Sequence, residues 1–377
     1  MNQKKWTYFK DCLPHKNGEF SKRNWGTQLH SLCSYQGKIK PSIAYHLLEI
    51  FSKKGEIVSD PFSGSGTIPL EASIAGRIPI ANDLSDMAVA LTNAKIGVTS
   101  NQGCEKIIED LEKWLAKRKI SKKTKKDTNN VSFNKNISEY FESETLSSIL
   151  KARDYFIESK DLEDANWCLV FSSMLHILHG NRPYALSRRS HPLTPYAPSG
   201  DFIKKDLINH LQTKVFKSLS YKQKLPLNKE FEVIQENVLS ISKAQKRVAD
   251  CIITSPPFAS STRFYMTNWM RFWFSGWGID DFNDAKKSFI ESKKKEGMNI
   301  YKDIFLELKP TLKTGGNLVL HVGKNSKVDM GAKLIEIDFP GFSFVDKFTE
   351  SVAFSEKHGV KDKGSTVAHQ YIVYENS

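Results

Sequence analysis

The segment from residue 56 to residue 83 constrains the fold more than any other part of the sequence. Residues 56–59 form a short apolar strand pattern, and the loop DPFSGSGT follows at residues 60–67. A helix is expected over residues 68–75, with a proline in its first turn and a glycine just past its end. Residues 77–83 then form a second strand that ends on an acid. This order predicts the opening of a doubly wound, mostly parallel α/β sheet.

The glycine loop could serve three classes of ligand, and single residues argue against two of them. A phosphate-binding P-loop requires a lysine after its last glycine, and no lysine follows Gly66. A dinucleotide fingerprint requires a glycine where Pro69 stands. The remaining class is a nucleoside cofactor without a pyrophosphate, with Asp83 as the acceptor of ribose hydroxyls. Taken alone, the loop more often marks a plain strand–helix turn.

A second motif, TSPPF at residues 254–258, follows an apolar strand pattern at residues 250–253. Consecutive prolines end the hydrogen-bond ladder and hold the backbone extended, so the carbonyls beside Ser255 and Pro256 are expected to face the crevice at the strand end. A serine hydroxyl, fixed carbonyls and the aromatic Phe258 suit the task of holding a planar base by its amino group. Taken alone, this motif more often marks a proline-terminated strand.

Together, DPFSGSGT and the later TSPPF resemble the DNA amino-methyltransferases, which transfer a methyl group from S-adenosylmethionine to an exocyclic nitrogen of cytosine or adenine. The resemblance extends to GKIKP at residues 37–41 and to VIQENVLSI at residues 233–241, where Asn237 stands in place of the more usual Asp. It implies a Rossmann-like sheet and S-adenosylmethionine as cofactor. The cofactor-binding residues that it implies are Lys40, Pro41, Asp60, Phe62, Gly64, Gly66, Thr67, Asp83 and Asn237.

The same resemblance assigns catalysis to Ser255, Pro256, Pro257 and Phe258. Serine at the first position is typical of cytosine-N4 enzymes, whereas adenine-N6 enzymes more often carry Asp or Asn. The implied function is site-specific methylation of a flipped cytosine at N4 in double-stranded DNA, within a restriction-modification system that pairs the enzyme with a restriction endonuclease. An adenine-N6 DNA methyltransferase, an RNA base methyltransferase of guanine-N2 type and a non-catalytic DNA-binding regulator remain as alternatives.

The motif positions divide the chain into three parts. Residues 1–99 are the expected N-terminal part of the cofactor-binding catalytic domain, and residues 230–377 are its catalytic half. Between them, residues 100–229 form a mostly helical, basic insertion that is the candidate target-recognition region. Within it, residues 182–229 contain ten Lys and Arg against two Asp. The candidate DNA-binding residues are Arg182, Arg188, Arg189 and Tyr196.

Charge and composition narrow the partner class and the compartment. Lys and Arg total 55 against 42 Asp and Glu, which gives a net charge of +13 and favours a nucleic acid over a membrane as partner. No apolar run approaches the roughly 20 residues of a membrane helix, and the first 20 residues lack the apolar core of a secretory signal. The 5 cysteines are scattered and form no Cys-x-x-Cys pair. We therefore expect a cytoplasmic protein without a metal site.

Two further expectations concern residues near the TSPPF motif. The aromatic residues between Tyr265 and Trp277 are expected to be buried in helices, because large aromatic side chains at such spacing more often fill a core than contact a base. His321 lies in an apolar strand pattern at residues 318–322 and is expected to be an ordinary strand residue.

Overall fold

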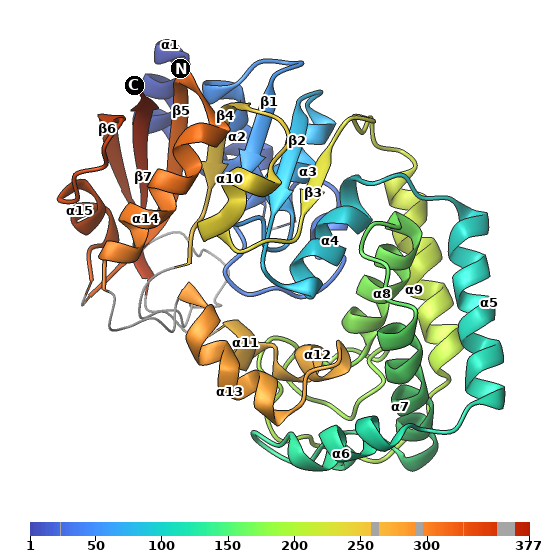
Figure 1. Ribbon diagram of the computed structural model, residues 1–377. Coiled ribbons are helices and arrows are strands. Elements are labelled where there is room, and N and C mark those ends of the chain that lie inside the picture. The colour runs from blue at the N-terminus through green and yellow to red at the C-terminus, as the bar shows by residue number, and fades with distance from the viewer. Residues whose placement is uncertain (23, 258–263, 291–296, 327, 353–365) are drawn as a thin grey trace.

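A mixed sheet with strand order β3-β2-β1-β4-β5-β7-β6 organises the computed structural model (Figure 1), which describes residues 1–377 except 23, 258–263, 291–296, 327 and 353–365. Its strands are β1 (Ile57–Asp60), β2 (Ile78–Asn82), β3 (Glu232–Ile234), β4 (Ala249–Thr254), β5 (Leu312–Asn325), β6 (Phe342–Ser351) and β7 (Thr366–Asn376). Strands β1 to β5 pair in parallel, and β7 pairs antiparallel with β5 and with β6. The predicted Rossmann-like, mostly parallel α/β fold is confirmed.

Alternate residues of the central strands fill two different apolar cores. Cys251 and Ile253 of β4 face a core that contains α1 (Gln3–Cys12), α2 (Pro41–Phe51) and α3 (Thr67–Ile74). Ile252, between them, faces the opposite core. This second core contains residues of α10 (Ile241–Ala244), α14 (Asn299–Leu308) and α15 (Met330–Ile335). Because successive strand side chains point to opposite faces, this apolar strand needs a cover on both sides.

A helical part lies beside the sheet (Figure 1). It is built on α4 (Asp86–Ile96), which packs against α8 (Ala165–Ile177). Its other helices are α5 (Asn101–Lys117), α6 (Lys122–Asn130), α7 (Ser143–Glu158), α9 (Leu207–Lys222), α11 (Phe264–Thr267), α12 (Trp269–Phe274) and α13 (Ile279–Ser288). Tyr265, Trp269, Phe272 and Trp273 are buried in its core, as predicted for this aromatic segment. The helical part therefore draws on a second stretch of chain, after the TSPPF motif, besides residues 100–229.

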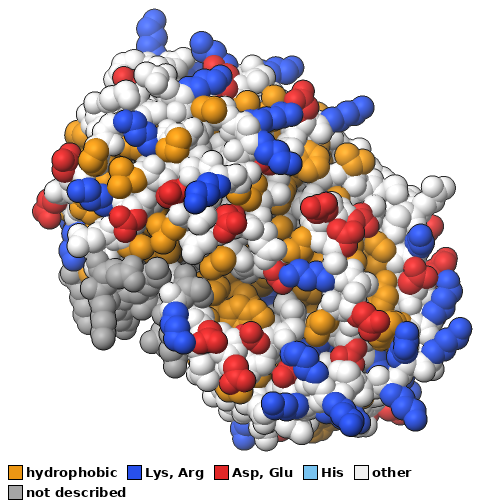
Figure 2. Space-filling model, viewed as in Figure 1, with side chains coloured by type: hydrophobic (Ala, Val, Ile, Leu, Met, Phe, Trp, Pro, Cys, Tyr) orange, Lys and Arg blue, Asp and Glu red, His pale blue; other side chains and the backbone are white. Residues whose placement is uncertain are grey.

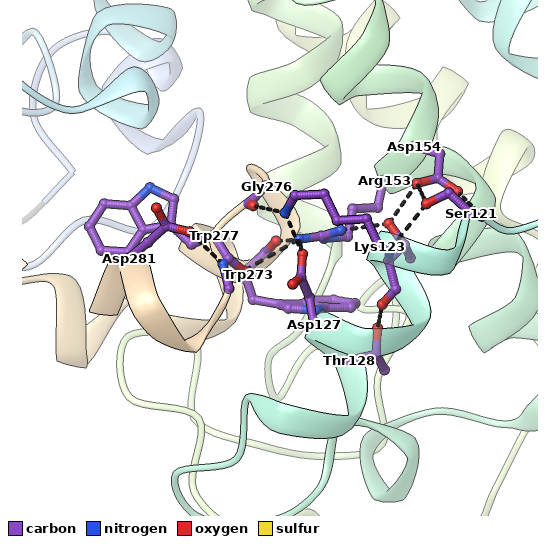
Figure 3. A network of polar contacts seen from close by, with 12 residues as sticks. Ser121, Lys123, Asp127, Thr128, Arg153, Asp154, Trp273, Gly276, Trp277 and Asp281 are labelled. Carbon is purple, nitrogen blue, oxygen red and sulfur yellow. Dashed lines mark hydrogen bonds and ion pairs between the residues drawn. The ribbon is translucent and has the colours of Figure 1, made fainter. Parts of the chain in front are cut away.

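A buried polar network ties α12 to the insertion (Figure 3). The fully buried guanidinium of Arg153, on α7, donates to the Trp273 carbonyl at 2.7 Å and to the Asp127 carboxylate at 2.8 Å. Lys123 donates to the same carboxylate at 2.7 Å and to the Gly276 carbonyl at 3.2 Å. Because these donors and acceptors come from α6, α7 and the end of α12, the network fixes these three elements against one another.

Among the residues that the structure describes, no helix is both long enough and apolar enough to cross a membrane. The segment between α8 and α9, residues 178–206, has no regular helix or strand, as expected for the Pro- and Ser-rich sequence it contains.

Candidate functional site

The two sequence motifs meet where the strand order reverses. Asp60 ends β1, and Ser255 directly follows β4. These strands are parallel neighbours in the sheet, with Ser59 opposite Ile252. In open α/β sheets, ligands bind outside the carboxyl ends of the strands at such a switch point. The structure therefore brings the glycine loop and the TSPPF motif to one edge of the sheet.

A side-chain hydrogen bond joins the two strand ends. The hydroxyl of Thr254 donates to the carboxylate of Asp60 at 2.6 Å, and both residues are buried. The same carboxylate accepts the backbone N–H of Phe62 at 3.3 Å, which begins the turn into the glycine loop. Thus the last residue of β4 and the first residues after β1 are held together through one carboxylate.

The glycine loop has the left-handed backbone that its sequence requires. Gly64 and Gly66 have φ of +50° and +70°, in the region that favours glycine. A Cβ on Gly66 would also lie 2.7 Å from the Thr92 hydroxyl of α4, so the loop can sit on this helix only with glycine there. Thr67 opens α3, and its hydroxyl lies 3.1 Å from that of Ser65. The loop is therefore a tight, fully specified turn between strand and helix.

Asp83 closes the loop from the neighbouring strand. Its carboxylate accepts the backbone N–H of Gly64 at 3.0 Å and that of Ser85 at 3.0 Å. Burial raises its pKa to about 6, although both hydrogen bonds favour the charged form. Burial likewise raises the pKa of Asp60 to about 7, and the nearby Asp83 adds to that rise. Two neighbouring carboxylates that have no ion-pair partner among the described residues are suited to a cationic ligand.

The remaining predicted cofactor residues on the N-terminal side lie around α2. Lys40 precedes the first turn of α2, and its ammonium donates to the carbonyl of His15 at 2.8 Å. Burial lowers the pKa of Lys40. Pro41 occupies the first position of the helix, where its missing N–H costs nothing. The Lys40 ammonium is therefore held by the N-terminal segment.

Two further predicted cofactor residues lie toward β3. Phe62 is half-buried against the core formed with α10 and α14. Asn237 follows β3 and caps a short 3₁₀ turn by accepting the N–H of Leu239 at 3.0 Å. Strand β3 is the neighbour of β2, which places Asn237 beyond the same edge of the sheet as Asp83. An aromatic ring and an amide near this edge suit the flat base of a nucleoside.

The TSPPF motif is anchored by two residues that the sequence analysis did not assign to the site: His321, which was expected to be an ordinary strand residue, and Tyr301. Ser255 donates its hydroxyl to the carbonyl of His321 at 2.9 Å, and the Nδ1 of that histidine lies 3.4 Å from the same hydroxyl. Tyr301 of α14 donates its hydroxyl to the carbonyl of Pro257. Pro256 lies between them, and the predicted catalytic Phe258 lies outside the described residues. The register between β4 and β5 is the signal that could have identified His321. Thr254 pairs with Leu320, so the next residues, Ser255 and His321, lie side by side.

The candidate recognition residues fall into two groups. Arg182, Arg189 and Tyr196 are exposed, with Tyr196 at 61%. Arg188 instead uses its guanidinium inside the loop, donating to the carbonyl of Gly200 at 2.7 Å and to that of Glu139 at 3.0 Å. Figure 2 shows Lys and Arg side chains over both parts of the viewed face, mixed with Asp and Glu. The side chains of the first three residues are exposed, whereas Arg188 holds the loop in place.

No cluster of three or more His, Cys, Asp or Glu side chains that could hold a metal ion occurs in the part of the chain that the structure describes.

Comparison with known proteins supports a methyltransferase domain. Residues 30–144 match the model of the UPF0020 family, described as an RMKL-like methyltransferase domain. This match includes the glycine loop and Asp83 but does not reach the TSPPF motif. The comparison with curated proteins found no match.

Several solved structures resemble the chain at low identity. TrmN from Thermus thermophilus is 13% identical over 93% of this chain, with a TM-score of 0.37; this chain spans about half (53%) of the TrmN chain. An rRNA methylase from Streptococcus thermophilus is 9% identical, with a TM-score of 0.33, over 90% of this chain and 97% of that one. The rRNA methyltransferase aviRa from Streptomyces viridochromogenes is 9% identical, with a TM-score of 0.35, over 91% and 88%.

The cofactor of this class of domain agrees with the chemistry of the residues present. S-adenosylmethionine supplies an electrophilic methyl group on a positively charged sulfur. The buried carboxylates of Asp60 and Asp83 suit that charge and the ribose hydroxyls, and the glycine loop between them admits close backbone approach. The match does not extend to the features that would assign the chain to the DNA cytosine-N4 family. The chain carries a Rossmann-like methyltransferase domain whose methyl donor is S-adenosylmethionine.

Proposed function

We propose that this protein methylates an exocyclic amino group of a nucleobase in RNA. The observation that carries this proposal is the junction of two strand ends, where Thr254 donates to Asp60 and Ser255 follows directly. One side of the junction has the acids suited to a sulfonium cofactor. The other has the Ser255 hydroxyl and the backbone carbonyls of Ser255 and Pro256, next to two consecutive prolines, which suit a planar amine.

The reaction requires placement more than strong acid–base chemistry. An exocyclic amine is a poor nucleophile because its lone pair is delocalised into the ring. Donation of its N–H groups to the Ser255 oxygen and the Pro256 carbonyl would turn the lone pair toward the methyl donor. The N–CH₃ bond then forms as the S–CH₃ bond breaks, and the ammonium proton leaves to water. Positioning of this kind can supply roughly 7–11 kcal/mol.

Exposed aromatic residues beside arginines support RNA as the substrate polymer. Tyr184, Tyr196 and Phe202 are 40%, 61% and 54% exposed and lie in the irregular segment between α8 and α9. Sequence-specific RNA recognition mostly uses unpaired bases, which stack on aromatic rings and guanidinium planes. The family model that matches the chain is also not a DNA amino-methyltransferase model. An unpaired RNA base would reach the site without the cost of leaving a duplex.

The second candidate substrate is cytosine N4 in double-stranded DNA. The serine in TSPPF favours it, because serine at this position is typical of cytosine-N4 enzymes. In that case a restriction endonuclease acting on the same site would be the expected partner.

One experiment separates these candidates. The protein is incubated with methyl-labelled S-adenosylmethionine and either total RNA or duplex DNA, and the nucleosides are identified by mass spectrometry. Label on an exocyclic nitrogen in RNA supports the proposal. Label only in DNA selects the second candidate, and label in neither, from protein that binds the cofactor, refutes a nucleic-acid substrate. The Ser255→Ala variant serves as the control for contaminating activity.

A further inference from the structure

His321 places a carbonyl acceptor and an imidazole nitrogen beside the hydroxyl of Ser255. The serine hydroxyl donates to the His321 carbonyl at 2.9 Å, and the imidazole Nδ1 lies at 3.4 Å. We propose that His321 is a positioning residue for methyl transfer, which turns the hydroxyl proton of Ser255 into the sheet and leaves the oxygen lone pairs for the substrate amine. This inference rests on the proposed function. It adds to that function the residue that sets the direction in which the Ser255 hydroxyl donates its proton.

A hydroxyl has one proton and two lone pairs, so its role depends on where the proton goes. If the hydroxyl proton pointed toward the substrate, it would face the N–H group of the amine, and two hydrogen-bond donors would oppose each other. Both acceptors of His321 lie on β5, so they keep the proton on the sheet side. A protonated imidazole would reverse this arrangement, because its Nδ1–H would donate to the serine oxygen and occupy a lone pair. The ring therefore has to stay neutral and to carry its single proton on Nε2, so that Nδ1 is the acceptor.

Buried neighbours keep the ring neutral and in place. Burial lowers the pKa of His321 to about 3, and the nearby His369 of β7 adds to the effect. The ring packs against His369 at 4.8 Å and against Tyr371, also of β7, at 5.2 Å between centroids. These contacts fix the plane of the imidazole, so its Nδ1 stays beside Ser255 across the neutral pH range.

The polar groups behind these rings contact one another. Glu350 of β6 accepts a hydrogen bond from the Tyr371 hydroxyl at 3.0 Å, and its carboxylate lies 2.8 Å from Nε2 of His15. Lys16 lies 3.5 Å from the same carboxylate. The negative charge of Glu350 favours protonation of His321, but burial outweighs it. The carboxylate is thus held by the N-terminal segment and not by His321.

Two substitutions distinguish positioning from mere packing. His321→Phe keeps a ring and the backbone carbonyl but removes Nδ1, and it should lower kcat about 10-fold, the size of one neutral hydrogen bond. KM for the cofactor and for the nucleic acid should stay unchanged. His321→Asn can place an amide oxygen where Nδ1 stood, and it should recover most of the lost kcat. Equal loss in both variants, or a rise in KM instead of a fall in kcat, overturns the proposal.

A double-mutant cycle shows whether His321 acts through Ser255. In the Ser255→Ala background, His321→Phe should produce no further loss of kcat, because the hydroxyl that it orients is gone. Losses that multiply would assign His321 a separate, structural role. Thermal unfolding and calorimetric cofactor binding show that each variant is folded.

A readout without turnover separates this inference from the proposed function. The imidazole ¹⁵N resonances of His321 in the full-length protein report whether Nδ1 is an acceptor, and they should shift when Ser255 is replaced by Ala. Absence of methyl transfer by the wild type refutes the proposed function. An unchanged His321 signal in Ser255→Ala refutes the positioning role, whatever the activity, and also decides the case if His321→Phe does not fold.

Discussion

Thr254 and Asp60 share a hydrogen bond of 2.6 Å between the ends of two neighbouring parallel strands. This contact ties the end of β1, which leads into the glycine loop, to the end of β4, which leads into the TSPPF motif. It also stabilises the charged form of a carboxylate whose burial raises its pKa to about 7.

Thr254→Val should weaken cofactor binding and lower stability. The substitution keeps the shape of the side chain but leaves the buried Asp60 without its hydroxyl donor, which should cost about 1–3 kcal/mol in the free energy of unfolding. Urea denaturation and calorimetry measure the two effects. Thr311→Val is the matched control, because that buried threonine donates to the Leu308 carbonyl at the end of α14. If the control weakens cofactor binding equally, the Thr254 contact has no special role.

Cofactor binding should tighten as pH rises. The pKa values of Asp60 and Asp83 are raised to about 7 and about 6, so the free protein holds protons on these groups at acidic pH. A cationic ligand favours the ionised carboxylates, so binding should release protons and the Kd should fall between about pH 5 and pH 8, then level off. Calorimetry in two buffers of different protonation enthalpy measures the release. A Kd independent of pH would show that neither acid faces the cofactor.

The free protein should show the opposite trend in stability from the same two groups. A buried acid with a raised pKa binds more protons when folded than when unfolded. Its contribution to stability is therefore present below the unfolded pKa of about 4 and is lost as pH rises toward about 7. Unfolding measured with and without S-adenosylmethionine should diverge over this range.

Ser255→Ala should lower kcat about 100-fold or more, because removal of one preorganised polar contact to the transition state typically lowers kcat by about that factor. Cofactor affinity should be nearly unchanged, because Ser255 contacts β5 and not the glycine loop. Single-turnover kinetics and calorimetry measure the two quantities. A loss of rate below about 3-fold, under 1 kcal/mol, would make Ser255 a structural residue.

Replacement of Arg182 and Arg189 by Ala should weaken nucleic-acid binding and reduce its salt dependence. For a single strand, the slope of log K against log salt should fall by about 0.7 for each phosphate that the variant no longer neutralises. Filter binding at several salt concentrations measures the slope. Arg188→Ala should behave differently, with lower stability as its main effect, because its guanidinium donates to Gly200 and Glu139. Identical effects from all three arginines would contradict this division.

Arg153→Met should destabilise the helical part by about 3–5 kcal/mol, because it leaves the Asp127 carboxylate without its buried partner. Lys123→Met is the matched control. Lys123 pairs with the same carboxylate, but its side chain is 61% exposed, so its loss should cost at most about 1 kcal/mol. Urea denaturation of the two variants gives the difference directly.

Local patterns predicted the elements around the glycine loop well. The left-handed backbone of the loop requires glycine at positions 64 and 66, and the acid at position 83 accepts the N–H of Gly64 from the end of the adjacent strand. The apolar residues from Ile304 to Leu312 predict a helix over residues 304–312, and this range differs from the structure. Helix α14 spans Asn299–Leu308 and a short 3₁₀ turn follows, because Pro310 cannot continue an α-helix.

Roles set by distant contacts could not be predicted from the sequence. Arg188 reads as a basic loop residue, yet its partner Glu139 lies far away in the chain. His321 reads as a strand histidine, and only the pairing of β4 with β5 places it beside Ser255. Arg153 forms a polar link between α7 and the helices after TSPPF by donating to the Trp273 carbonyl. The periodicity of the sequence does not indicate this link.

The TSPPF motif lies in the chain between the two parts of the fold. Tyr301 of α14 donates to the Pro257 carbonyl from the sheet side, whereas α11 and α12, later in the chain, pack into the helical part. Under the proposed function, the segment that holds the base would therefore join the sheet, which holds the methyl donor, to the body that contacts the polynucleotide.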